Sequence, residues 1–302
     1  MKMQQINSNN YVFESSVNIG YVHEGNQGII IDAAIDKSAI RKVVRQLEEK
    51  NLPITHLFIT HAHADHYGGA KYLKESYKVK IIAPTLEAAI IKHPVLEPTY
   101  LFSGNDPLDE LRNKFLEGPP IEVDLTIDEG HYEIDGFNFE AIATPGHSYN
   151  QLALGINGTL FAADSYFGQK EILKHKIPYI TSVDKTINSL EKLKSYSFDG
   201  SVPGHGPYEE DYLNTVEKNI EYHKELLHKV YCIIQDKQPV SHEDIVAELC
   251  EAMKVKADQL SMFLLFRTAV TAYLTALINK GNIEHYIQQF RWMFKIKEEE
   301  GA

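Results

Sequence analysis

The chain has 302 residues, of which 43% are hydrophobic and 24% charged, a composition typical of a globular protein rather than a disordered one. It contains 30 basic and 42 acidic residues, and the resulting net charge of -12 disfavours nucleic acid as a partner. No apolar signal region opens the sequence, and no later run approaches the ~18 apolar residues of a membrane span. We therefore expect a cytoplasmic protein that does not associate with membranes.

The first part of the chain alternates short apolar runs with helical patterns. A helix is predicted over residues 36–50, where apolar residues recur at helical spacing and Asp36 is a suitable N-cap. Strands are predicted at residues 11–13, 19–23, 28–33, 54–59 and 79–84. This alternation predicts sheets with helices packed on their outer faces.

Four residues with metal-binding side chains follow the strand at 54–59, namely His61, His63, Asp65 and His66. Imidazole and carboxylate groups are ligands of zinc, iron and manganese. The period-two spacing of His61 and His63 directs both toward one cation, and Asp65 and His66 then face a second position. A solvated loop rich in histidine is the alternative, but four such residues in six positions favour a metal site. Glycines at 68–69 permit a tight turn into the next helix.

Regular patterns break down over residues 86–120, where five prolines interrupt apolar and aromatic residues. The segment is too apolar for a disordered linker, so we expect an ordered insertion. Beside a metal loop, such an insertion serves as a lid or as a wall of the substrate site. It could equally form a contact in a homodimer, and the sequence does not decide between these roles.

Three further ligand-type residues follow predicted strands. An alternating strand over 137–143 leads through a Pro-Gly turn to His147. A hairpin with Asn-Gly at its turn, over 151–163, ends at Asp164. After a helix around 183–196, an apolar run leads to His205, whose flanking glycines allow its backbone to enter a crowded site.

The motif His61-x-His63-x-Asp65-His66, completed by His147, Asp164 and His205, resembles the signature of the metallo-β-lactamase superfamily. The resemblance implies an α/β (α+β) fold, a four-layer αββα sandwich. It also implies two divalent cations, with zinc favoured and iron or manganese as alternatives. In that family pattern one cation is bound by His61, His63 and His147, the other by Asp65, His66 and His205, and Asp164 bridges them. The resemblance further places Asp32 beneath the metal loop and lets Asp65 orient the nucleophile as a catalytic residue.

The tail of the chain changes to a helical pattern. Helices are predicted over 216–234, from 241 onward and over 260–278, followed by two short strands. This order resembles a winged-helix module, which divides the chain into a catalytic domain over 1–212 and a C-terminal domain over 213–302. The helix in the place of a recognition helix carries Arg267 and Lys280 as its cations, which is poor phosphate-binding chemistry. We therefore expect this module to pack or to form a substrate wall.

These observations favour a metal-dependent hydrolase that cleaves a small ester or thioester, similar to glyoxalase II. Phe167 stands where the lactonase branch of the family has tyrosine, which disfavours a homoserine-lactone substrate. Three alternatives stay open. They are a mono-iron oxidoreductase of the persulfide dioxygenase type, a phosphodiesterase like RNase Z, and a regulator without enzymatic activity that acts through the tail.

Overall fold

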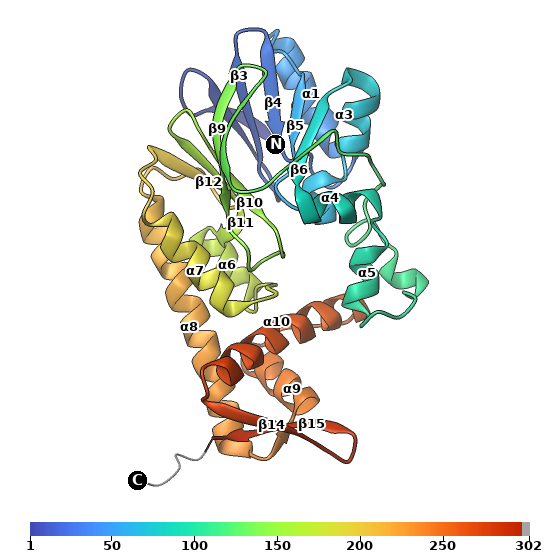
Figure 1. The fold of residues 1–302 in the computed structure, drawn as a ribbon, viewed down its shortest axis with the longest axis vertical. Helices are drawn as coiled ribbons and strands as arrows, with labels where there is room; N and C mark the ends of the chain where they lie inside the picture. Colours follow the sequence, from blue (N-terminus) through green and yellow to red (C-terminus); the bar gives the residue numbers. More distant parts are fainter. Residues whose placement is uncertain (298–302) are drawn as a thin grey trace.

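The computed structural model of the chain describes residues 1–297 and contains a mixed α/β lobe with a smaller helical lobe beneath it (Figure 1). Two sheets face each other in the larger lobe. The first sheet has the order β1-β2-β3-β4-β5-β6-β7, and its strands are Lys2–Gln5, Asn10–Glu14, Ile19–Glu24, Gln27–Ile31, His56–Phe58, Lys80–Pro84 and Leu125–Ile127. The second has the order β12-β11-β10-β9-β8, formed by Gly200–His205, Thr159–Phe167, Leu152–Ile156, Phe137–Ala143 and Gly130–Ile134.

The two sheets enclose one apolar layer and are covered by helices outside. Val22, Phe58, Leu154 and Phe161 belong to the layer between the sheets. Helix α1 (Lys37–Glu49) covers the first sheet, and helices α7 (Val183–Leu193) and α8 (Tyr212–Lys237) cover the second. The predicted four-layer αββα arrangement is therefore confirmed.

Parallel pairing in the first sheet explains why the site forms at one edge. Strands β4, β5, β6 and β7 run parallel, joined by α1 and by α3 (Ala70–Tyr77). Loops that leave the carboxyl ends of parallel strands meet at the same edge of a sheet. As predicted, Asp36 caps α1 by accepting a hydrogen bond from the Ala39 amide. Among the strands of these two sheets, β1, β7 and β8 were not predicted from the sequence.

The segment over 86–120 is more regular than expected. It holds helices α4 (Thr85–Lys92) and α5 (Leu96–Leu101) and a single 3-10 turn at Asp109–Leu111. Leu101, Leu111 and Leu116 form an apolar cluster with Leu264 of the C-terminal lobe. The insertion therefore packs against the tail of its own chain, a contact that the sequence did not indicate.

The C-terminal lobe combines three helices with a small sheet. Its helices are the second half of α8, α9 (His242–Ala252) and α10 (Leu260–Asn279). The sheet has the order β13-β15-β14, from Val240–Ser241, Arg291–Ile296 and Ile283–Gln288. The domain boundary predicted at 212/213 falls in the first turn of α8, which packs on the second sheet through Val216 and in the C-terminal core through Val230.

Helix α10 has the length and composition of a membrane-spanning helix, with a mean hydropathy of 1.6 over an 18-residue window. In the structure 44% of that window is buried. Val270, Tyr273 and Leu277 face the core of the C-terminal lobe. Burial inside the protein therefore accounts for much of its apolar surface.

Candidate metal centre

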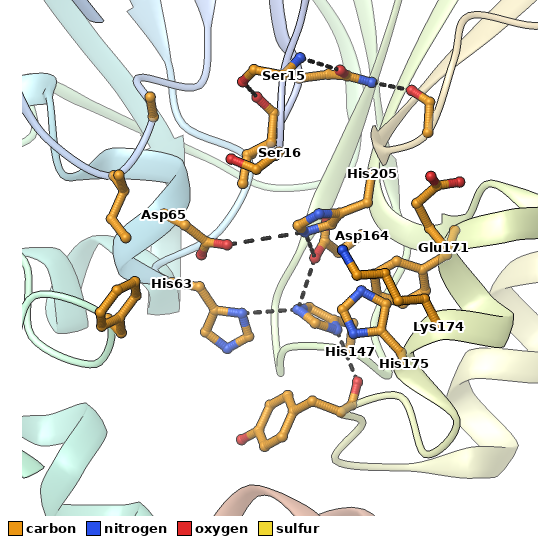
Figure 2. Close-up of a pocket in the computed structure, with 18 of the residues that line it drawn as sticks. Ser15, Ser16, His63, Asp65, His147, Asp164, Glu171, Lys174, His175 and His205 are labelled. Atoms are coloured by element: carbon orange, nitrogen blue, oxygen red, sulfur yellow. Dashed lines mark hydrogen bonds and ion pairs between the residues drawn. The ribbon is translucent and has the colours of Figure 1, made fainter. Parts of the chain in front are cut away.

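The seven ligand-type residues predicted from the sequence come together at the shared edge of the two sheets. The loop after β5 carries His61 and His63, and helix α2 (Ala64–Tyr67) carries Asp65 and His66. His147 follows β9, while Asp164 and His205 lie on β11 and β12. Figure 2 shows His63 and Asp65 on one side of a cavity and His147, Asp164 and His205 on the other. The cavity has a volume of about 780 Å³.

Three imidazoles form the first cluster of donor atoms. His63 Nδ1 lies 3.0 Å from His61 Nε2 and 2.8 Å from His147 Nε2. Ring nitrogens that converge in this way are the donor set of a borderline divalent cation. His61, His63 and His147 thus lie as the sequence predicted for one cation.

The second cluster contains Asp65, His66 and His205, whose donor atoms lie within 4.8 Å of one another. Asp164 lies between the two clusters. Its Oδ2 is 3.4 Å from His147 Nε2 and 3.2 Å from His205 Nε2. Its Oδ1 lies 3.3 Å from His66 Nε2, and both of these buried atoms lack a hydrogen-bond partner among residues 1–297. This carboxylate therefore contacts residues of both clusters.

Asp32 determines which ring nitrogen two of the histidines present. Its carboxylate accepts hydrogen bonds from the Thr60 amide and hydroxyl, and from His66 Nδ1 at 2.7 Å. Because the Thr60 hydroxyl donates to Asp32, it accepts from His61 Nδ1 at 3.0 Å. In their neutral forms both imidazoles therefore carry the proton on Nδ1 and present an Nε2 lone pair to the site.

His147 is oriented from a different part of the chain. Its Nδ1 donates to the main-chain carbonyl of Tyr179 at 3.0 Å, which again leaves Nε2 facing the cluster. The rings of Tyr179 and Phe167 both lie against His147, with centroid distances of 5.7 and 6.1 Å. Tyr166, by contrast, is buried in the core beneath the second sheet, so its phenol does not line the cavity.

Glu87 of α4 joins the two ligand loops. One carboxylate oxygen accepts from the Ala62 amide at 2.9 Å. The other accepts from the Ser148 hydroxyl at 2.7 Å and the Asn150 amide at 2.9 Å. A single buried side chain thereby holds the His61 loop and the His147 loop at a fixed separation. No sequence pattern indicated Glu87 as part of the site.

The glycines of the metal loop act through close packing. Gly68 and Gly69 form the predicted turn between α2 and α3, but their φ values of -56° and -87° are open to any residue, so the turn itself does not require glycine. A Cβ at Gly68 would lie 2.0 Å from the Ile35 carbonyl oxygen, and one at Gly69 would lie 2.2 Å from that of Ala33. Glycine is needed here because the backbone of the loop after β4 touches this segment.

Asp164 lies within a strand and not at its end. The predicted hairpin is present, but β11 continues to Phe167 with an irregular register against β12. Ala163 has a left-handed φ of 49°, which redirects the chain before the carboxylate. On β12, a Cβ at Gly204 would lie 1.9 Å from Asp164 Oδ1. The glycine before His205 therefore leaves room for the central carboxylate.

The protonation of the buried groups follows from their surroundings. Burial lowers the pKa of His61 well below 6.5, that of His63 to about 4 and that of His147 to about 3. Burial also opposes the charged form of His66, but Asp164 and the other carboxylates near it raise its pKa well above 6.5. The negative charge that holds this proton would equally attract a divalent cation.

Several residues that line the cavity do not belong to any motif recognised in the sequence. Helix α6 (Gln169–His175) places Glu171, Lys174 and His175 at positions i, i+3 and i+4 on the cavity wall. Glu97 of α5 also lines the cavity, with an oxygen 4.0 Å from His63 Nε2, and burial raises its pKa well above 4.5. For these residues the sequence offers a single indication, which is that the i, i+3 and i+4 spacing of the three polar residues on α6 places them on one face of a helix.

The chain is similar in sequence to one described family and to several curated proteins. A family model described as the metallo-beta-lactamase superfamily matches residues 12–205. Among curated proteins, a hydroxyacylglutathione hydrolase of Rhodopseudomonas palustris is 26% identical over 154 residues, which cover 50% of this chain and 48% of the relative. The chain thus spans about half the length of that relative. A beta-lactamase-like protein 2 homolog of Caenorhabditis elegans is 23% identical, with 85% of this chain and 75% of the relative covered.

Solved structures show the same fold over nearly the whole chain. A beta-lactamase domain protein from Burkholderia ambifaria has a TM-score of 0.76 at 17% identity, covering 98% of this chain and 93% of the other. A metallo-beta-lactamase family protein from Thermus thermophilus has a TM-score of 0.73 at 15% identity, with coverage of 97% and 100%. At these identities the likeness concerns the fold alone, and it includes the C-terminal lobe.

Proposed function

Because the chain belongs to the metallo-beta-lactamase superfamily, we propose that it is a binuclear metal-dependent hydrolase that cleaves a small ester or thioester. The observation that carries the proposal is the convergence of seven imidazole and carboxylate groups in two clusters around Asp164. The similarity to hydroxyacylglutathione hydrolases supports a thioester as the substrate class.

The residues present fit two cations. The first would be held by His61, His63 and His147, whose low pKa values keep them neutral, as metal binding requires. The second would be held by Asp65, His66 and His205, with Asp164 between them. The predominance of imidazole favours zinc over hard cations, and iron or manganese are alternatives. Bound cations of this kind supply hydroxide near neutral pH and positive charge for the carbonyl oxygen.

The chain's own groups would position the substrate and the attacking water. Asp65 is partly exposed to the cavity, and its Oδ2 lies 4.0 Å from His205 Nε2, so it can accept a hydrogen bond from the water and orient it. Phe167 and Tyr179 close the space beside His147 and exclude bulk solvent. On the cavity wall, Lys174 provides a cation for an anionic group of the substrate.

One observation favours a second candidate. Asp65, His66 and His205 form a group of two imidazoles and one carboxylate, the donor set of mono-iron oxygenases. An oxidoreductase of the persulfide dioxygenase type would use that group alone and leave His61, His63 and His147 without a metal.

Metal analysis of the purified protein, combined with a substrate panel, tests the proposal. We expect two metal ions per chain and hydrolysis of a thioester or ester, with no oxygen consumed. One iron per chain with oxygen consumption on a persulfide would support the second candidate and overturn the first. Turnover of a phosphodiester in place of thioesters, esters and lactones would contradict the proposed substrate class.

A further inference from the structure

A second cavity, of about 580 Å³, lies in the C-terminal lobe between α5, α10 and the β14-β15 hairpin. Figure 1 shows α10 reaching from this hairpin to the insertion that carries α5. Among the described residues, its lining shares no member with that of the metal cavity. Its size suits a ligand of nucleotide dimensions, since small-molecule sites span roughly 300 to 1,000 Å³.

Two of the chain's five arginines line this cavity, Arg267 on α10 and Arg291 on β15. Arg267 contacts the Ser103 hydroxyl at 3.4 Å, and within residues 1–297 neither guanidinium forms an ion pair with a carboxylate. Glu243 also lines the cavity but forms no ion pair with either arginine among the described residues, so the two guanidinium groups are a local exception to the chain's net charge of -12. Guanidinium groups that form no ion pair with a carboxylate have free N–H donors and are suited to binding a phosphate.

Aromatic rings lie beside the arginines. Trp292 stacks on His242 with a centroid distance of 5.4 Å and an interplanar angle of 5°, and its indole nitrogen donates to His285 Nδ1 at 3.1 Å. The Trp292 ring is therefore held in place. Phe290, at the tip of the hairpin, is 104% exposed, and Tyr100 contributes a third ring from α5. Exposed rings beside guanidinium groups suit a flat aromatic ligand that carries a negative charge.

His242 adds a hydrogen-bond acceptor without a partner. The Thr271 hydroxyl donates to the Arg267 carbonyl at 2.7 Å, so it accepts from His242 Nε2 at 2.8 Å. The proton of His242 is therefore on Nε2, and Nδ1 is an acceptor. This atom is buried without a hydrogen bond, and the nearby Glu243 carboxylate at 3.4 Å is itself an acceptor. An amino group on a ligand could donate to Nδ1.

From these contacts we propose that the cavity binds a nucleoside phosphate, either free or as part of a single strand. Arg267 and Arg291 bind the phosphate, the base packs against the rings of Trp292 and Phe290, and its amino group donates to His242. The sequence did not suggest this because one arginine comes from the helix and the other from the hairpin, which are brought together only by folding. This proposal does not rest on the proposed hydrolase function, because the two cavities share no lining residue among those described.

Trp292 offers a direct probe because it is the single tryptophan of the chain, so its fluorescence reports on this cavity alone. Adenosine 5′-monophosphate should change the fluorescence saturably, whereas adenosine and ribose 5-phosphate, each lacking one half of the ligand, should bind at least about 10-fold more weakly. Isothermal titration calorimetry with the same compounds confirms binding without relying on the optical signal.

The arginine double variant Arg267→Gln/Arg291→Gln should weaken binding of adenosine 5′-monophosphate by about 10-fold or more, since each lost charged hydrogen bond contributes substantially. Lys256→Gln is the matched control, because Lys256 is exposed in the same lobe and does not line the cavity. Hydrolase activity should be unchanged in all of these variants. Absence of saturable binding, or equal binding by the double variant, would overturn the proposal.

A short oligoadenylate distinguishes the two sources of this ligand. If the natural ligand is part of a strand, the oligomer should bind more tightly than the mononucleotide and with a steeper dependence on salt. If it is a free nucleotide, the two affinities should be similar. Binding of the oligomer that is insensitive to the arginine double variant would count against the site.

Discussion

Replacement of Glu87 by glutamine tests whether one buried carboxylate holds the two ligand loops in register. The carboxylate accepts three hydrogen bonds, one from Ala62 and two from the segment that follows His147. Glutamine has the same shape but a single oxygen acceptor. If that oxygen keeps the bonds to Ser148 and Asn150, the amide nitrogen faces the Ala62 N–H, and two donors then oppose each other.

The magnitude follows from two opposing effects. A buried N–H without a partner costs about 1 to 3 kcal/mol, and the lost bond was to a charged group. Burial raises the pKa of Glu87, so a neutral side chain removes part of the cost of burying a charge. We therefore expect Glu87→Gln to lower the free energy of unfolding by about 1 to 3 kcal/mol and metal affinity by about 10- to 100-fold.

The assay combines three measurements, which are denaturant unfolding, metal retention during dialysis and kcat at saturating metal. Glu75→Gln on α3 is the control, because Glu75 is exposed and does not line the metal cavity. We expect excess metal to restore most of the activity of Glu87→Gln. Unchanged stability together with unchanged metal retention would refute the view that Glu87 joins the loops.

Three further predictions concern the centre and the C-terminal core. Asp164→Ala should abolish activity and lower the metal content measured by atomic emission, with circular dichroism unchanged. Gly204→Ala should do the same, because its Cβ would displace the Asp164 carboxylate, and full activity would contradict the crowding at this point. Burial lowers the pKa of His223 to about 4, so its neutral form stabilises the fold above about pH 6.5, and this stability is lost as the pH falls toward 4. Because of His223, the unfolding free energy should fall by about 2 kcal/mol more between roughly pH 7 and pH 5 than it would without this residue. This additional fall should be absent in His223→Gln and unchanged in the exposed control His228→Gln.

The ligand positions could be predicted because each one is encoded locally. His61 and His205 follow apolar runs that read as strands, and loops at the carboxyl ends of neighbouring strands meet at one edge. The motif spacing also separates the two clusters, since His63 and His66 face different positions. Geometry thus places the seven groups together as expected, while their occupancy by metal stays a prediction.

The supporting residues could not be predicted because their partners are distant in the chain. Glu87 lies in a segment that the prolines made appear irregular, and its hydrogen bonds reach 25 and 61 residues away. The same applies to Tyr179, which contributes a main-chain carbonyl that any residue type could supply. Because every residue has a main-chain carbonyl, the residue type at the acceptor position does not reveal such a hydrogen bond.

Helix α10 of the C-terminal lobe also contacts the insertion and the metal cavity. Leu264 packs into the apolar cluster of the insertion, and the adjacent Leu265 lines the metal cavity. Two residues further, Arg267 lines the second cavity, while Val270 and Tyr273 face the core. Successive positions on a helix point about 100° apart, so one element can contact four environments within ten residues. A ligand in the arginine cavity would therefore touch the same turn of helix that forms a wall of the metal site.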